Sequence, residues 1–399
     1  MKIFHSLGHV IGGTLLIAGT TIGVGMLALP VATGPGGLLP TAIVYFACWV
    51  FMLCTGLLLV EVSLWMPKNT SFISMADRLL GPMGRIVFWL VYLFLFVTVM
   101  IAHIAGGGEV VRDFVGYEVP HLVTTIVYTV FFVPIVYLGA YSVDRLNLIL
   151  ISGVAICYLG FIALAAPSVQ ASYLSYVNWP KAWMSLPILF TAFTYQVIIP
   201  TLVNYMQRDA RKIRLAVIFG SLIPLVVYLL WDVIILGIIP VEGANGLLEA
   251  AKLGQNAVAP LAHVVQDGRI YMVGKYFAFF ALTTSFVPLS LSFFDFLADG
   301  LKWKKDGIHK VGLCFLVFGI PLVIALKFPN IFLVALGYAG GISCALLFGF
   351  MPPLMAWVGR YKEKFPRKGY RLPGGKALLG ILMVIAILIL VSELTQQLW

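Results

Sequence analysis

Charged residues are scarce in this sequence of 399 residues. Lys, Arg, Asp and Glu make up 11% of the chain, whereas a typical soluble domain has about 25%. Hydrophobic residues make up 61%. A water-soluble core cannot bury so much apolar surface. The composition therefore excludes a soluble globular protein and predicts an all-α polytopic membrane protein whose solvent is the lipid bilayer.

Catalytic and metal-binding motifs are also lacking. The five cysteines lie in apolar runs without metal-ligand spacing or a disulfide framework. The six histidines are scattered, and the chain has no HExxH, GxSxG or P-loop motif. We therefore expect no enzyme, no catalytic residues, no cofactor and no metal site. Without a P-loop or a soluble domain, ATP-driven transport is not expected of this chain alone.

Long apolar runs are what the sequence has. A membrane helix needs about 20 apolar residues, and eleven stretches qualify. The ninth is short. The predicted spans are 7–32, 36–65, 84–111, 121–139, 146–166, 183–205, 215–239, 275–298, 311–326, 331–357 and 376–394.

Basic residues orient these spans. With the N-terminus in the cytoplasm, 20 of the 26 Lys and Arg residues fall on the cytoplasmic side and 6 on the other. This asymmetry follows the positive-inside rule and places the C-terminus on the outer side of the membrane. It also accounts for the net charge of +10, so no nucleic-acid partner is implied. The one long external loop, 240–274, is either a short amphipathic helix across the outer mouth or a plain tether.

The first span contains an unusual stretch, AGTTIGVGMLALP, at residues 18–30. Three glycines and two threonines lie in the middle of a helix that glycine weakens by about 1 kcal/mol each. Such residues are tolerated at membrane depth where backbone lines a cavity. Close packing of small residues between helices is the other interpretation.

The sixth span carries a second polar interruption. Its sequence is LPILFTAFTYQVIIPTLVNYM, at residues 186–206, with TAFTYQ at the centre. Broken helices at matching positions of two halves are typical of secondary transporters with inverted repeats. Five spans separate the two breaks, so the second half enters from the opposite side. We therefore expect one transporter domain over 1–399, with inverted repeats of about 7–166 and 183–357 and an extra helix at about 376–394.

Unwinding the first span creates a site for a zwitterion. Free N–H groups at the start of the outer half-helix attract a carboxylate, whereas free carbonyl groups at the end of the inner half attract an ammonium group or a cation. An amino acid carries both groups close together. The residues therefore predict an amino acid transporter rather than a channel, for which no repeated polar ring is present.

These motifs resemble known transporters. AGTTIGVGMLALP resembles the first-helix motif of the amino acid–polyamine–organocation superfamily. The sixth span, TTSFVPLSLSFFDFLADGLK (283–302) and FLVALGYAGGISCALLFGFMPPLMAW (332–357) resemble the hydroxy/aromatic amino acid permeases, with the tyrosine permease branch nearest. The resemblance covers nearly the whole chain. It implies the leucine-transporter fold and import of an aromatic amino acid together with a proton, with tyrosine as the first candidate. It also implies a location in the bacterial inner membrane, so that the N-terminus is cytoplasmic and the C-terminus periplasmic.

The resemblance also implies site residues. Backbone N–H groups of Gly23, Val24 and Gly25 would bind the substrate carboxylate, and carbonyl groups near Thr20 and Ile22 would bind its ammonium group. The side-chain pocket would be lined by Phe193, Thr194, Tyr195 and Gln196. The sequence departs from the family at Gln196, where members of the family carry histidine in a Ser-Phe-Gly-Phe-His pattern. This departure removes a titratable group and leaves the exact side-chain specificity open.

Ionisable residues inside the membrane are candidates for ion coupling. His103 in the third span has an ordinary pKa near 6.5, which suits a proton carrier. Asp232 in the seventh span is a second candidate, and Glu61, Glu109 and Asp295 are weaker ones. The alternative for His103 is a neutral ring that bonds to a neighbouring helix, and the alternative for Asp232 is a structural role. Glu61 and Asp295 lie nearer the inner face, where water can reach them, and Glu109 lies near the outer end of the third span.

A rival ion is sodium. Thr284 and Ser285 in the eighth span offer hydroxyl oxygens, which hard cations prefer. Sodium coupling, a broader specificity for neutral amino acids and a transporter-fold sensor therefore remain alternatives to proton-coupled tyrosine import.

Overall fold

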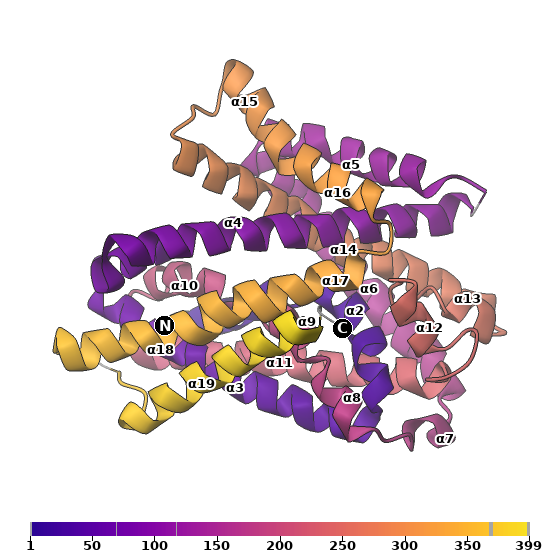
Figure 1. The fold of residues 1–399 in the computed structure, drawn as a ribbon, viewed down its shortest axis with the longest axis horizontal. Helices are drawn as coiled ribbons and strands as arrows, with labels where there is room; N and C mark the ends of the chain where they lie inside the picture. The colour runs from indigo at the N-terminus through magenta and orange to yellow at the C-terminus, as the bar shows by residue number, and fades with distance from the viewer. Residues whose placement is uncertain (1, 69, 117, 367–369, 397–399) are drawn as a thin grey trace.

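The computed structural model describes residues 2–68, 70–116, 118–366 and 370–396, and within these ranges the chain is helical without a β-strand. Most of the long helices lie roughly along one common axis (Figure 1). Ten helical segments are long and apolar enough to cross a membrane, and the bent pair α1 and α2 makes an eleventh. When the bent pair is counted as one span, the described residues therefore contain eleven candidate spans, as many as the sequence predicts.

The spans have these bounds, in chain order. The first five are α1 and α2 (Lys2–Thr21 and Val24–Thr33), α3 (Leu38–Trp65), α4 (Phe72–Val115), α5 (His121–Leu138) and α6 (Ala140–Ala165). The next three are α8 to α10 (Trp179–Trp183, Leu186–Ala192 and Ile199–Tyr205), α11 (Ala210–Ile238) and α14 (Gly268–Leu301). The last three are α15, η4 and α16 (Gly307–Cys314, Phe315–Gly319 and Ile320–Lys327), α17, η5, α18 and η6 (Phe332–Tyr338, Ala339–Phe350, Met351–Trp357 and Val358–Lys362) and α19 (Gly375–Gln396).

A further helical segment precedes the third span. Helical structure begins at Phe72, and the non-helical residue Gly81 separates this first segment from the rest of α4. Gly81 has a φ of 76°, a left-handed conformation that glycine adopts without strain, and Pro82 needs no N–H bond at the start of a new helical turn. The pair therefore marks a kink in α4, close to the predicted start of the span at residue 84.

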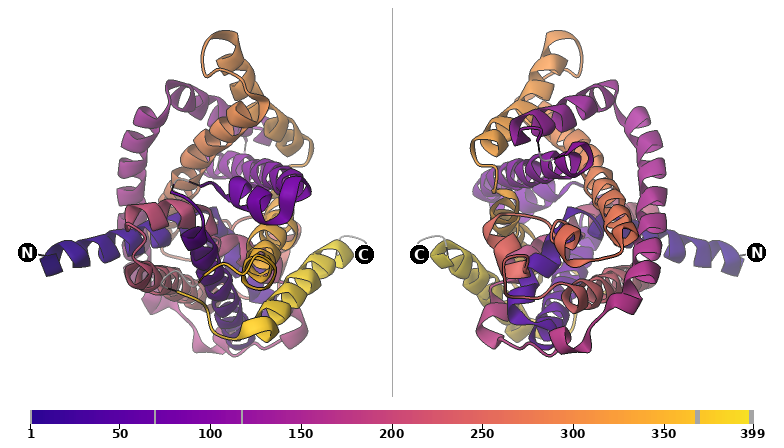
Figure 2. Two further views of the ribbon diagram at one scale, coloured as in Figure 1. Left: turned by 90° about the vertical axis from the view of Figure 1, so that its left-hand side faces the viewer. Right: turned by 90° about the vertical axis from the view of Figure 1, so that its right-hand side faces the viewer.

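The loop at 240–274 contains short helices rather than a plain tether. α12 (Leu247–Lys252) and α13 (Leu261–Val264) lie at the same end of the bundle as α7 (Ala171–Leu174) and α8 (Figures 1 and 2). The N–H group of Ala257 donates to the carbonyl oxygen of Leu27 at 2.9 Å, and α12 contacts α2. The loop therefore packs directly on α2, the second half of the first span.

A buried ion pair joins two spans, and the segment before a third, at the other end of the bundle. The guanidinium group of Arg360 donates to both carboxylate oxygens of Glu61, and the two side chains are each 1% exposed. Arg360 also donates to the carbonyl oxygen of Leu372, whose N–H group donates to Glu61 at 2.9 Å. Each charge has a partner, so this cluster fixes α3, η6 and the segment before α19 to one another. Glu61 thus has a structural partner.

Candidate functional site

The first span is broken where the sequence predicted. α1 ends at Thr21 and α2 begins at Val24, with a bend of 58° between the two halves. The N–H group of Met26 turns back to the carbonyl oxygen of Gly23 at 3.0 Å. The break therefore leaves backbone groups of both half-helices without their usual partners four residues away.

The sixth span is broken as well. α9 ends at Ala192, Phe193 to Tyr195 are not helical, and the 3₁₀ turn η3 (Gln196–Ile198) leads into α10. Pro200 at the start of α10 has no N–H group to bond to the preceding turn. The two breaks face one another, because α2 packs against α9.

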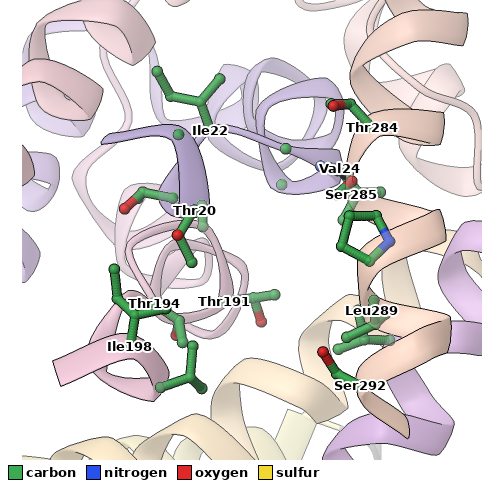
Figure 3. Close-up of a pocket in the computed structure, with 18 of the residues that line it drawn as sticks. Thr20, Ile22, Val24, Thr191, Thr194, Ile198, Thr284, Ser285, Leu289 and Ser292 are labelled. Carbon is green, nitrogen blue, oxygen red and sulfur yellow. Dashed lines mark hydrogen bonds between the residues drawn. The ribbon is translucent and has the colours of Figure 1, made fainter. Parts of the chain in front are cut away.

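A cavity of about 680 Å³ lies against both breaks. Figure 3 shows Thr20 and Ile22 at the end of α1, Val24 beside Ser285 of α14, and Thr191 and Thr194 on the sixth span. The cavity is lined by Leu15, Leu16, Gly19, Thr20, Thr21, Ile22, Gly23, Val24, Gly25, Tyr92, Leu95, Phe96, Val99, His103, Asn147, Ile151, Thr191, Ala192, Thr194, Val197, Ile198, Thr284, Ser285, Pro288, Leu289, Ser292 and Cys344. Its volume is in the range of small-molecule sites.

The glycines of the first break have separate roles. A Cβ atom at Gly25 would lie 2.9 Å from the Cα atom of Ala192, and one at Gly23 would lie 3.0 Å from the Cβ atom of Ser285. A Cβ atom at Gly19 would have no heavy atom within 4 Å. Gly23 and Gly25 therefore permit close packing of the first span on the sixth and eighth spans, which is the interpretation that the sequence offered as an alternative.

The backbone at the first break offers groups of both signs. Among the described residues, no hydrogen bond is found to the carbonyl oxygens of Thr20 and Ile22, or from the N–H groups of Gly23 and Gly25. The N–H group of Val24 lies 3.3 Å from the hydroxyl oxygen of Ser285. The end of α1 is therefore partially negative and the start of α2 is partially positive, within one cavity.

His103 is connected to this backbone through Ser285. The Nδ1 atom of His103 lies 2.7 Å from the carbonyl oxygen of Val99, so it carries a proton, and Nε2 lies 2.9 Å from the hydroxyl oxygen of Ser285. The same hydroxyl group faces the N–H group of Val24. A titratable ring is thus separated from the start of α2 by a single hydroxyl group.

Thr284 and its neighbours form the opposite wall. The hydroxyl group of Thr284 donates to the side-chain oxygen of Asn147 in α6 at 2.7 Å, and both residues line the cavity. The hydroxyl group of Ser285 lies 3.1 Å from the carbonyl oxygens of both Ala281 and Leu282. Within the described chain, no group of three or more His, Cys, Asp or Glu side chains is arranged to hold a metal ion.

Three predicted pocket residues turn away from the cavity. Phe193, Tyr195 and Gln196 are buried and absent from its lining, whereas Thr194 lines it. The hydroxyl group of Tyr195 and the side-chain amide of Gln196 both donate to the carbonyl oxygen of Met52 in α3, at 3.1 and 3.3 Å. The physical reason is that the turn after Ala192 directs these side chains towards α3, where their polar groups find partners in the protein.

The remaining ionisable candidates lie outside the cavity. The carboxylate of Asp232 is fully buried and accepts from the hydroxyl group of Thr33 in α2 at 2.8 Å. Asp295 pairs with Lys305 at an exposed position, and Glu109 lines a separate cavity of about 230 Å³ with Arg112. Of these candidates only Asp232 touches a half-helix of the first span.

Several lining residues were missed from the sequence. Tyr92 and Phe96 form an aromatic wall on α4, Ser292 lies on α14, and Cys344 accepts from the hydroxyl group of Thr194 at 3.2 Å. An aromatic residue in an apolar run carries no sequence signal that separates a cavity wall from a lipid-facing surface. The i, i+4 spacing of Tyr92 and Phe96 is a signal that places them on a common helix face, but it does not show what that face contacts.

Comparisons with known proteins agree over almost the whole length. The model of the tryptophan/tyrosine permease family matches residues 7–393. The chain is 30% identical to tyrosine-specific transport system 2 of Haemophilus influenzae, over 97% of this chain and 96% of that protein. It is 25% identical to the tryptophan-specific transport protein of the same organism (98% and 96%) and 26% identical to the low affinity tryptophan permease of Escherichia coli (95% and 93%).

These relatives are transport proteins and not enzymes, as expected from the lack of catalytic motifs. The apolar helices and the bacterial relatives together describe a multi-pass protein of the inner membrane. The chain belongs to the tryptophan/tyrosine permease family.

Proposed function

We propose that this protein imports an aromatic amino acid, with tyrosine as the first candidate, together with a proton. The observation that carries the proposal is the cavity in which free carbonyl and N–H groups of the first break lie beside His103. The similar proteins are named for tyrosine or tryptophan, and two that are named for tyrosine are 29 and 30% identical to this chain.

The main chain of the substrate binds at the first break. The N–H groups of Gly23, Val24 and Gly25 receive the carboxylate at the start of α2, and the carbonyl groups of Thr20 and Ile22 receive the ammonium group. The aromatic ring lies between Tyr92 and Phe96 of α4 and the apolar side chains of α14. Aromatic rings stack favourably on such walls, and hydroxyl groups such as that of Ser292 suit a phenol or an indole N–H.

His103 couples the proton to the carboxylate. When the ring gains a proton, Nε2 changes from acceptor to donor towards Ser285, and the hydroxyl proton of Ser285 turns to the carbonyl oxygen of Ala281 or Leu282. The positive charge then lies next to the start of α2, where the carboxylate binds. Each ligand therefore strengthens binding of the other, as reciprocal coupling requires.

Transport follows from alternating access in a leucine-transporter fold. The inverted repeats are about 7–166 and 183–357, and α19 is the extra helix. The bundle of spans 1, 2, 6 and 7 rocks against spans 3, 4, 8 and 9. The cavity lining includes the C-terminal part of α1, which is the first half of the first span, the middle of α4 and the N-terminal part of α6. The halves of the first and fifth spans that line it are the cytoplasmic ones if the N-terminus is cytoplasmic and the C-terminus periplasmic. In that orientation this conformation faces inward.

Sodium coupling is the second candidate. Thr284 and Ser285 line the cavity beside the free carbonyl groups of α1, so hydroxyl and carbonyl oxygens that suit a hard cation lie close together. Their hydroxyl groups already donate within the protein, which favours the proton.

The deciding experiment is uptake of radiolabelled tyrosine and tryptophan into proteoliposomes. An inward proton gradient is compared with an inward sodium gradient at matched membrane potential. Accumulation driven by the proton gradient alone supports the proposal. Accumulation driven by sodium alone transfers coupling to Thr284 and Ser285. Binding without accumulation under either gradient favours a sensor, and uptake of tryptophan without tyrosine contradicts the proposed specificity.

A further inference from the structure

One hydroxyl group is bonded to both helix breaks. Tyr228 of α11 is fully buried, and its hydroxyl oxygen lies 2.7 Å from the carbonyl oxygen of Thr21 and 3.0 Å from that of Ala192. These are the last carbonyl groups of α1 and α9, the half-helices that end at the two breaks. Tyr228 itself is not among the residues that line the cavity.

The two carbonyl groups are those that a continuous helix would use. In an α-helix the N–H group of residue i donates to the carbonyl group of residue i−4. Continuing α1 into α2 would pair Gly25 with Thr21, and continuing α9 would pair Gln196 with Ala192. The single hydroxyl proton of Tyr228 is shared between these two acceptors. A carbonyl oxygen can accept a second hydrogen bond, so Tyr228 does not block the helical pairing, but it satisfies both buried carbonyl groups in the broken conformation and thereby reduces what closing either break would gain.

We propose that Tyr228 is the positioning residue that holds both breaks open and fixes their backbone groups for the α-amino and α-carboxylate groups of the substrate. This inference rests on the proposed function. Its physical basis is the rigid peptide plane. Because the hydroxyl group holds the carbonyl group of Thr21, the peptide plane that joins Thr21 and Ile22 is fixed. The free carbonyl groups of Thr20 and Ile22 belong to the peptide planes on either side of it. The N–H group of Gly25 likewise stays free for a carboxylate.

The aromatic ring of Tyr228 provides the fixed base for this hydroxyl group. It packs edge-to-face on Phe193, at 5.4 Å between ring centroids, and Phe193 packs on Tyr45 of α3 in the same way. Removing the hydroxyl oxygen alone therefore leaves the ring contacts in place. It leaves two buried carbonyl groups without a donor, and each can recover one by pairing with the residue four positions later.

The test is Tyr228→Phe, measured by equilibrium binding to the purified full-length protein. The probes are L-tyrosine and 3-(4-hydroxyphenyl)propionate, which lacks only the amino group. We expect the variant to bind tyrosine at least about tenfold more weakly, and the preference for tyrosine over the des-amino compound to shrink by a similar factor. A merely structural loss would weaken both ligands equally, and that result would overturn the inference, as would tyrosine binding within about threefold of the wild type.

Tyr158→Phe is the matched control. The hydroxyl group of Tyr158 in α6 donates to the carbonyl oxygen of Val227 at 2.9 Å, one residue before Tyr228, and touches neither break. Like Tyr228→Phe, this variant removes a hydrogen bond from a tyrosine hydroxyl group to a backbone carbonyl group, and the carbonyl group here belongs to α11. We expect it to change neither affinity by more than about twofold, whereas a loss equal to that of Tyr228→Phe would contradict the inference.

Hydrogen exchange on the wild-type protein gives a second test that needs no variant. Peptides covering 22–27 and 193–198 are predicted to change their exchange together when tyrosine is added, because one hydroxyl group serves both breaks. Unrelated changes would overturn the inference. Failure of the wild type to bind any aromatic amino acid would count against the proposed function instead. In that case the exchange of the two peptides is compared in the protein without substrate. Coordinated exchange of both peptides would support the role of Tyr228, and independent exchange would overturn it.

Discussion

The two helix breaks lie against each other but are built differently. In the first span the break exposes backbone, because Gly23 and Gly25 let it pack tightly and leave carbonyl and N–H groups facing a cavity. In the sixth span the break is filled by side chains, since Tyr195 and Gln196 turn to α3 and bond to Met52. The first break is suited to a ligand, and the second is suited to anchoring.

The largest effect is expected at the point where the breaks touch. Gly25→Leu places a side chain against the backbone of Ala192 and forces the two spans apart. Displacements of about 1 Å in a site can cost 100-fold in rate, so we expect tyrosine uptake to be lost while the protein still inserts in the membrane. Membrane abundance by immunoblot is the control. Normal uptake by this variant would show that the contact does not shape the site.

The next effect concerns coupling. His103→Gln keeps a polar group near Ser285 but cannot gain a proton. Coupling between two ligands typically changes affinity by about 5–150-fold, so proton-driven accumulation should decrease by a factor in this range. Tyrosine exchange without a gradient should persist. His121→Gln, in α5 and outside the cavity lining, is the matched control. Undiminished proton-driven accumulation in His103→Gln would remove this residue from the coupling step.

The anchoring role of the second break predicts a change in stability rather than selectivity. Gln196→Leu removes the acceptor of the Tyr195 N–H group and a donor to Thr55 at a fully buried position. Leaving a buried N–H group unpaired costs about 1–3 kcal/mol, so the thermal midpoint in detergent should fall. The ratio of tyrosine to tryptophan uptake should stay the same. A changed ratio would place Gln196 in contact with substrate, as the sequence first suggested.

The smallest effect is expected at Gly19, the remaining glycine of the stretch 18–30. Gly19→Ala adds a methyl group that meets no heavy atom within 4 Å, and alanine favours helix by about 1 kcal/mol. Uptake at saturating tyrosine should stay within about twofold of the wild type, with equal or higher stability. A strong loss of uptake would mean that substrate passes close to Gly19, and would extend the ligand site beyond the break itself.

The spans and the breaks could be predicted because their signals are local. Hydropathy located all eleven spans, and glycine, threonine and proline located both breaks within a few residues. The direction of side chains at the second break could not be predicted in this way. The side chains of Tyr195 and Gln196 point away from the cavity and bond to the carbonyl group of Met52, which lies more than 140 positions earlier in the chain.

Tyr228 shows the same limit more clearly. It lies in the run LVVYLLW, where a tyrosine is indistinguishable from a lipid-facing aromatic residue. Its partners, Thr21 and Ala192, are backbone groups 207 and 36 positions away, so no side-chain pattern marks them. The sequence suggested Asp232 as a coupling residue because it is charged. In the structure one of its carboxylate oxygens accepts from Thr33, and the side chain lies outside the cavity.

The buried pair of Glu61 and Arg360 has a consequence for biosynthesis. The two residues are 299 positions apart, so at about 5–20 residues per second a ribosome adds Arg360 roughly 15–60 s after Glu61. During that interval a carboxylate in apolar surroundings has no guanidinium partner, which is costly in a membrane. The end of α3 that carries Glu61 therefore reaches its final burial only after the tenth span has been made. Nascent chains that stop earlier are expected to leave this end of α3 exposed.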